Sequence, residues 1–310
     1  YASTKLCELI LPQFKMKLDE RTTWSLEGAR VAHPTDCSLS SRFEEILSKP
    51  GQRHLVALVN AETGAEVTYG QLNEQANQLA RRLLARIHRS GSSPNAEGDN
   101  IVALRFLPGQ ELVVALLAIF KAGLAYVPIA PNWPEGRIQH ILEDCAPIMV
   151  ITNTNARLIY RAENKVTGGG NQREILQYED LMDEATAKKV STENLSDNES
   201  IGGQVIGSTL YTVLYTSGST GKPKGVRHLH SAALNRIHWQ WDTFPYTEDE
   251  VCVFKTTLTF IDSVIEIWAP LLSGRRLVIM PTKFTENVER FVETLETFNI
   301  GRIFVVTSLV

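Results

Sequence analysis

The sequence predicts an α/β fold built from mostly parallel, doubly wound sheets. Apolar runs typical of buried strands alternate along the chain with segments whose apolar residues recur at helical spacing. The connections between these segments are short, which favours parallel strands joined by helices over the alternative, an α+β arrangement. With 310 residues the chain is long enough to bury a large core, either in one large α/β domain or in two lobes.

The first helix is marked by its own start signal. Thr68 and Gln71 have the spacing of a capping box, and apolar residues then recur at helical spacing, so we expect a helix over 69–88. The elements expected next are a strand at 101–106, a helix from Pro108 to about 121, a strand at 125–129, a helix from Pro134 to about 145 and a strand at 148–152.

Residues 153–207 interrupt this alternation. They contain "TGGGN" and "STENLSDNES", so we expect an inserted, mobile surface segment with one helix near 177–189. The elements expected beyond it are a strand at 209–216, a helix at 230–241, a strand at 251–256, a helix at 263–272, a strand at 276–280, a helix at 285–297 and a strand at 303–306. Residues 1–40 show no sustained period and are predicted to be a leader or linker before a domain over 41–310.

Composition narrows the classes of partner. The net charge of −4 gives no electrostatic footprint for nucleic acid or an anionic membrane. The longest apolar stretch, 112–120, is about half as long as a membrane span requires. Four cysteines are scattered without metal-ligand spacing, which favours reduced thiols and a cytoplasmic protein.

The stretch "LYTSGSTGKPKGV" (214–226) has the composition of a polyphosphate cradle. Glycines let backbone N–H groups surround phosphate oxygens, hydroxyls donate to the same oxygens, and Lys222 and Lys224 add positive charge. A flexible Ser/Gly linker is the alternative, but the loop follows an apolar strand and Pro223 stiffens it. Only two residues separate Gly218 from Gly221, so the Walker A spacing fails and a P-loop ATPase is disfavoured.

Three motifs occur in an order that resembles the adenylate-forming (AMP-binding) superfamily, which includes acyl-CoA synthetases, luciferases and nonribosomal peptide synthetase adenylation domains. "YTSGSTGKPKGV" resembles its phosphate-binding motif, and "VTYGQLNEQANQLARRL" (67–83) resembles its early helix motif. "FKAGLAYVPIAPNWPEGRI" (120–138) is similar to a peptide-synthetase motif, with Ala130 where aspartate is usual. The resemblance covers about 40–310 and implies the fold of that superfamily, truncated before its C-terminal subdomain.

The resemblance implies a two-step reaction with ATP and Mg²⁺. The carboxylate of an amino acid attacks the α-phosphate of ATP, and the acyl group then passes to the phosphopantetheine thiol of a carrier domain. Lys224 would support catalysis and Thr216 would hold the metal. The residues implied to bind the ATP phosphates are Thr216, Ser217, Gly218, Ser219, Thr220, Gly221 and Lys224.

Residues 233–274 resemble the synthetases that activate β-alanine and join it to biogenic amines. In α-amino-acid adenylation domains an aspartate directly after phenylalanine pairs the substrate ammonium, whereas here the order is Phe260-Ile261-Asp262. A carboxylate displaced by one residue suits a β-amino acid, whose ammonium lies one carbon further from its carboxylate. Asp262 as a simple helix N-cap is the alternative interpretation. Glu266, on the same helix, is assigned no catalytic role.

The resemblance also implies further parts of the full-length protein. The family's adenine-contacting Tyr-Gly-Pro-Thr-Glu segment, its ribose-binding aspartate and its main catalytic lysine are expected beyond Val310, as are carrier and amine-selecting domains. We therefore expect these 310 residues to be inactive alone. Two other functions stay open, namely a coenzyme A ligase acting on an acid without an amine, and a degenerate nucleotide-binding module.

Overall fold

The computed structural model describes residues 15–18, 24–27, 31–153, 174–183, 189–217 and 222–305. The chain forms two compact units, Tyr1–His33 and Pro34–Val310. In the first, β1 (Lys15–Leu18) pairs antiparallel with β2 (Trp24–Glu27). In the larger unit, Ser38 caps a helix that begins at the buried Leu39.

The larger unit contains a six-stranded sheet with the order β10-β9-β6-β5-β7-β8. Every neighbouring pair is parallel except the β9–β10 pair at one edge. The strands are β5 (Ile101–Arg105), β6 (Ala125–Pro128), β7 (Met149–Thr152), β8 (Glu174–Gln177), β9 (Leu210–Thr216) and β10 (Lys224–Leu229).

A second sheet of five strands has the order β13-β11-β12-β3-β4. Its pairs are parallel except β3–β4, which is antiparallel. The strands are β3 (Val56–Asn60), β4 (Glu66–Thr68), β11 (Val251–Phe254), β12 (Arg276–Ile279) and β13 (Ile300–Arg302). These two mostly parallel sheets confirm the predicted α/β class.

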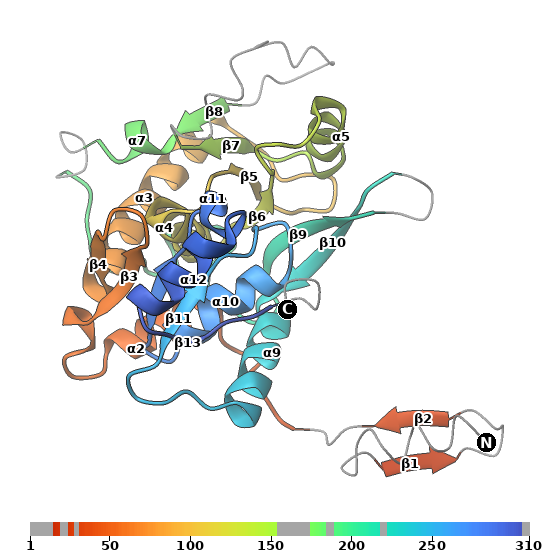
Figure 1. Cartoon of the computed structure of the whole chain (residues 1–310). Helices are drawn as coiled ribbons and strands as arrows, with labels where there is room; N and C mark the ends of the chain where they lie inside the picture. The colour runs from red at the N-terminus through yellow and green to blue at the C-terminus, as the bar shows by residue number, and fades with distance from the viewer. Residues whose placement is uncertain are drawn as a thin grey trace. The chain divides into compact units, whose positions relative to one another are not determined.

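Helices lie between and around the sheets (Figure 1). They are α2 (Leu39–Leu47), the 3₁₀ turn η1 (Gln52–His54), α3 (Tyr69–Ser90), α4 (Gln110–Lys121), α5 (Glu135–Cys145), α7 (Tyr178–Leu181), α9 (His230–Thr243), α10 (Asp262–Leu271), α11 (Thr282–Thr285) and α12 (Val288–Thr297). The predicted capping box at Thr68 and Gln71 starts α3. Phe120 and Trp268 are fully buried, with ring centroids 5.2 Å apart, in the core that both sheets share. Among the described residues, no helix has the length and apolarity of a membrane span.

Several elements differ from the sequence predictions, among them α2, β3 and β4, which were not predicted. The helix expected at 285–297 is present as α12, which begins three residues later because the Asn287 side chain accepts a hydrogen bond from the Arg290 N–H at 3.0 Å and caps it, and the short α11 before it was not predicted. The last described strand is β13, so the prediction of a strand at 303–306 is wrong at least as far as residue 305. Strand β10 was not predicted, because most of its side chains are exposed and give no buried apolar pattern.

The described parts of 153–207 are integrated into the larger unit. Strand β8, which was not predicted, extends the six-stranded sheet. The helix expected near 177–189 corresponds in the described residues to the four-residue α7. Further along, Arg81 of α3 donates to the carbonyl oxygens of Glu193 and Asn194, at 2.6 and 3.2 Å. The Ile201 N–H donates to the Ala122 carbonyl at 2.9 Å. This segment lacks regular secondary structure, and these bonds satisfy backbone groups that would otherwise have no hydrogen-bond partner.

Candidate functional site

The predicted phosphate loop connects two antiparallel strands at the edge of the six-stranded sheet. Strand β9 runs parallel to β6 and ends at Thr216, and β10 returns antiparallel to it. Thr216 lies opposite Lys224 in the register of the two strands. The loop therefore leaves the sheet at the carboxyl end of a parallel strand, where ligands of open α/β sheets bind.

The described loop residues present their side chains to solvent. Thr216, Ser217, Lys222 and Lys224 are all exposed, so two hydroxyls and two ammonium groups are available at the ends of this loop. The other predicted phosphate-binding residues, Gly218, Ser219, Thr220 and Gly221, lie outside the described residues.

Helix α5 holds the base of the loop on both sides. The Tyr215 hydroxyl donates to Asp144 Oδ2 at 2.5 Å, and His140 Nε2 lies 3.2 Å from the Pro223 carbonyl oxygen. Burial, followed by the hydrogen bond to Asp144, raises the pKa of Tyr215, so its hydroxyl stays protonated as a donor. Helix α5 thus fixes Tyr215, the residue before Thr216 on β9, and Pro223, the residue before β10.

Gly225 allows β10 to lie close to Tyr215. A Cβ atom at Gly225 would lie 3.0 Å from Val213 Cγ1 and 3.1 Å from Tyr215 Cζ. Both distances are tighter than ordinary van der Waals contact, so a larger residue would displace the Tyr215 ring. Gly225 directly follows Lys224 on β10 and allows this strand to pack closely against β9.

The predicted substrate residues lie at the start of α10. Phe260 and Ile261 are 62% and 41% exposed, and Asp262 is exposed at the first helical position. The N-cap residue is Ile261, and no side chain caps the helix. The alternative interpretation of Asp262 as the N-cap is therefore wrong, although its negative charge still lies in the favourable first turn of the helix.

Helix α9 connects the two groups of candidate residues. It follows β10 directly and packs against α10. Arg236 on α9 interacts electrostatically with Asp262, whose charge opposes the lowering of the Arg236 pKa by burial. The guanidinium of Arg236 also lies 4.5 Å from the centre of the Trp239 ring. Among the described residues, no hydrogen bond or ion pair joins the loop to Asp262 directly.

The two histidines after the loop, His228 and His230, are both at least partly buried. His230 is fully buried at the start of α9, and its Nδ1 accepts a hydrogen bond from the Leu39 N–H at 3.3 Å. Burial lowers the pKa of His230 to about 3, so it is neutral near pH 7. His228 is partly buried on β10, and burial lowers its pKa as well.

Sequence reasoning missed Asp144 and His140, and it named Glu266 only to assign it no catalytic role. Asp144 and His140 lie on α5, more than 70 residues before the loop, and their partners depend on chain folding. Glu266 did carry a signal, because it is the one charged residue of "SVIEIWAPL" (263–271), an otherwise apolar stretch of α10. A charge in such a stretch requires buried partners.

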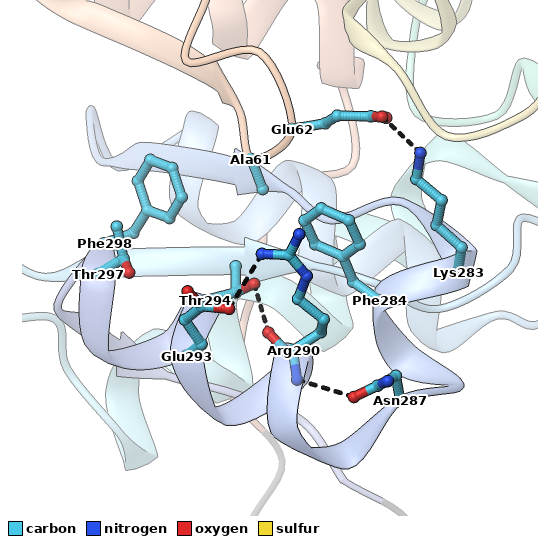
Figure 2. Close-up of a pocket in the computed structure, with 10 residues that line it drawn as sticks. All are labelled: Ala61, Glu62, Lys283, Phe284, Asn287, Arg290, Glu293, Thr294, Thr297 and Phe298. Carbon is cyan, nitrogen blue, oxygen red and sulfur yellow. Dashed lines mark hydrogen bonds and ion pairs between the residues drawn. The ribbon is translucent and has the colours of Figure 1, made fainter.

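A pocket of about 630 Å³ lies elsewhere, between α11, α12 and the turn after β3. Figure 2 shows Lys283 reaching toward Glu62 and Arg290 lying beside Phe284. Arg290 also pairs with Glu293 at 3.0 Å. The charged groups of this pocket are paired with one another, and none of the predicted site residues lines it.

The described residues contain no cluster of three or more His, Cys, Asp or Glu side chains that could hold a metal ion. The predicted magnesium ligand, Thr216, offers an exposed hydroxyl oxygen. Magnesium prefers oxygen ligands and in nucleotide sites is bound through one or two carboxylates together with phosphates and water. The Thr216 hydroxyl offers one oxygen of the kind that magnesium prefers.

Comparison with known proteins shows the family. A family model described as AMP-binding enzyme matches residues 44–310. The chain is 42% identical over 246 residues to "Beta-alanyl-bioamine nonribosomal peptide synthetase ebony" of Drosophila melanogaster, covering 79% of this chain and 26% of that protein. It is 32% identical over 280 residues to "Dimodular nonribosomal peptide synthase" of Bacillus subtilis (strain 168), covering 88% of this chain and 11% of that protein. The chain thus spans about a quarter or less of these two relatives.

Solved structures share the fold. The N-terminal subdomain of Klebsiella oxytoca NpsA, in complex with 3-hydroxybenzoyl-AMSN, matches with a TM-score of 0.65 and 24% identity over 85% of this chain and 58% of that chain. The nonribosomal peptide synthetase FmoA3 (S1046A) matches with a TM-score of 0.67 and 22% identity over 87% of this chain and 25% of that chain. Together with the matched family model, these likenesses show that the chain belongs to the AMP-binding enzyme family, as a relative of nonribosomal peptide synthetase adenylation domains.

Proposed function

We propose that this chain is part of an ATP-dependent ligase that activates a β-amino acid, β-alanine, as its adenylate. The activated acyl group then passes to a phosphopantetheine thiol on a carrier domain and finally to a biogenic amine. The similarity to ebony supports the choice of β-alanine, and the similarity to nonribosomal peptide synthetases supports a carrier in the same protein. We further propose that these 310 residues alone do not form adenylate and that the protein is cytoplasmic.

The position of Asp262 carries the proposal. Its carboxylate is exposed at the start of α10, beside the exposed side chains of Phe260 and Ile261. An α-amino acid would place its ammonium near the residue directly after Phe260, which here is the apolar Ile261. The extra methylene of β-alanine extends the ammonium further, where a carboxylate one residue later can pair with it.

The loop after β9 would hold the ATP. Lys224, opposite Thr216 in the strand pair, would lie beside the phosphates and neutralise charge on the departing pyrophosphate. The hydroxyls of Thr216 and Ser217 would donate to phosphate oxygens, together with residues 218–221. Magnesium, held by the Thr216 oxygen and the phosphates, would supply charge neutralisation. In the reaction the acid's carboxylate oxygen bonds to the α-phosphorus, and the bond from that phosphorus to pyrophosphate breaks.

The test is ATP–pyrophosphate exchange by the full-length protein with β-alanine, L-alanine, a fatty acid and an aromatic acid. The proposal predicts the highest kcat/KM with β-alanine. A higher value with an acid that lacks an amine would contradict the proposed substrate and favour a coenzyme A ligase. No exchange with any acid would favour a nucleotide-binding module without activity.

A further inference from the structure

Glu266 is a charged side chain in the core. Its side chain has 0% exposed area, and it lies on α10 one helical turn after Asp262. Burying a carboxylate costs much free energy unless it is ionically paired or hydrogen-bonded. The Glu266 carboxylate therefore requires hydrogen-bond or ionic partners in the core.

The partners of Glu266 among the described residues belong to the first two residues after β11. Glu266 Oε2 accepts hydrogen bonds from the backbone N–H groups of Lys255 at 3.0 Å and Thr256 at 2.8 Å. Glu266 Oε1 accepts from the Thr256 hydroxyl at 2.8 Å, and the Lys255 ammonium lies 3.6 Å from the same oxygen. An ionised carboxylate, which only accepts, satisfies all four groups at once.

These contacts fix one end of the loop 255–261, which links β11 to α10. The other end is also held by α10, because the Ser263 hydroxyl donates to the Phe260 carbonyl at 2.6 Å and the Ser263 N–H donates to it at 3.1 Å. Inside the loop the Phe260 N–H donates to the Thr257 carbonyl at 3.1 Å. Helix α10 thus clamps both ends of the loop that carries the exposed side chains of Phe260 and Ile261.

We propose that Glu266 is a positioning residue for the amino-acid site: its carboxylate holds the start of the loop 255–261 and thereby sets where Phe260, Ile261 and Asp262 lie. This inference rests on the proposed function, which makes these three residues part of that site. Glu266 itself touches no substrate, since its side chain is fully buried. Burial raises the pKa of Glu266, and the hydrogen bonds from Thr256 and Lys255 oppose that rise.

The main test is Glu266→Gln in the full-length protein, assayed by exchange with whichever acid the wild type activates best. A glutamine amide points an NH₂ donor at one of the donors that Glu266 now accepts from, so the loop start loses its fixed place. We expect the KM for the acid to rise about tenfold or more and the KM for ATP to change less than about threefold. Glu296→Gln, an exposed change on α12, is the matched control and leaves both values unchanged.

A milder variant separates positioning from loss of folding. Thr256→Val removes the hydroxyl that donates to Glu266 Oε1 and keeps the backbone N–H bond. We expect the KM for the acid to rise about two- to fivefold, while the thermal unfolding transition stays cooperative. Equal rises in the KM for ATP and for the acid, or no change in either, would overturn the proposal.

Amide hydrogen exchange provides a readout that does not depend on activity. In Glu266→Gln the amides of residues 255–261 should exchange faster, while those of β5 keep the wild-type rate. An unchanged rate in 255–261 would overturn the proposal. A wild type that prefers another acid would contradict β-alanine as substrate, yet the Glu266 variants still test the positioning role with that acid.

Discussion

Tyr215 donates a hydrogen bond to Asp144 at 2.5 Å and thereby joins the end of β9 to α5. The next residues along the chain are Thr216 and Ser217, where the proposed phosphate loop begins. Because β9 also pairs with β6 and β10, the start of the loop is held by strands and a helix together. This arrangement places a glycine-rich loop on a rigid base, as precise ligand binding requires.

Tyr215→Phe should weaken the attachment of β9 to α5 while the aromatic ring remains packed in the core. It removes the hydroxyl and leaves the Asp144 carboxylate without its donor, so we expect a loss of about 1–2 kcal/mol in the free energy of unfolding. The KM for ATP should rise severalfold. Urea denaturation and exchange kinetics check the two effects, and Tyr246→Phe, a partly buried tyrosine that bonds Gln240, is the control. An unchanged KM for ATP would show that the bond does not support the loop.

Lys224→Ala should weaken ATP binding more than substrate binding. A charge-assisted contact to phosphate contributes about 1.5–3 kcal/mol, so we expect the KM for ATP to rise about tenfold or more. The KM for the acid should change little. Lys49→Ala, an exposed change after α2, is the matched control. Equal ATP kinetics in the two variants would contradict the assignment of Lys224.

Asp262→Ala should abolish β-alanine-dependent exchange. Removal of the carboxylate leaves the substrate ammonium without its partner, a loss of about 2–5 kcal/mol when the pair is shielded from water. Isothermal titration of ATP measures whether the loop still binds nucleotide, which we expect. Asp249→Ala, an exposed change in the turn before β11, is the control. Near-normal exchange by Asp262→Ala would show the substrate assignment wrong.

His230 predicts a dependence of stability on acid pH. Burial lowers its folded pKa to about 3, whereas the unfolded value is 6.5. Its contribution is therefore fully present above pH 6.5 and is lost as the pH falls toward 3, by roughly 1.4 kcal/mol per pH unit between these values. His230→Phe removes the titrating group, at the cost of an acceptor for the Leu39 N–H.

The measurement for His230 is the free energy of unfolding of both proteins between pH 4 and pH 8. The wild type should lose stability faster than His230→Phe as the pH falls. The reason is that the imidazole, neutral in the folded wild type, binds a proton once the chain unfolds, which favours the unfolded state at acid pH. Parallel curves would contradict the account of His230.

Much of the fold was predictable because local signals agreed with the final packing. Helix α3 has a capping box and apolar residues at helical spacing, and both persist in the structure. Strands β5 and β6 are buried along their whole length, so each shows as an apolar run in the sequence. Where propensity, pattern and caps agree, sequence reasoning succeeds.

Other parts depend on distant partners that leave no local pattern. Strand β10 is exposed, and its pairing with β9 sets its structure. Residues 191–194 are held by side chains of α3, among them Asn77, which donates to the Thr192 carbonyl at 2.7 Å. The motifs predicted a phosphate loop and a substrate role for Asp262, whereas the hydrogen bonds of Asp144 and Glu266 became evident only from the structure.

Moving the carboxylate tests the central claim most directly. The double variant Ile261→Asp with Asp262→Ala returns the acidic residue to the position directly after Phe260. The measurement is kcat/KM for β-alanine divided by that for L-alanine, in ATP–pyrophosphate exchange by the full-length protein. The account predicts a ratio well above one in the wild type and a fall of about tenfold or more in the variant. An active variant with an unchanged ratio would contradict the claim that Asp262 selects a β-amino acid.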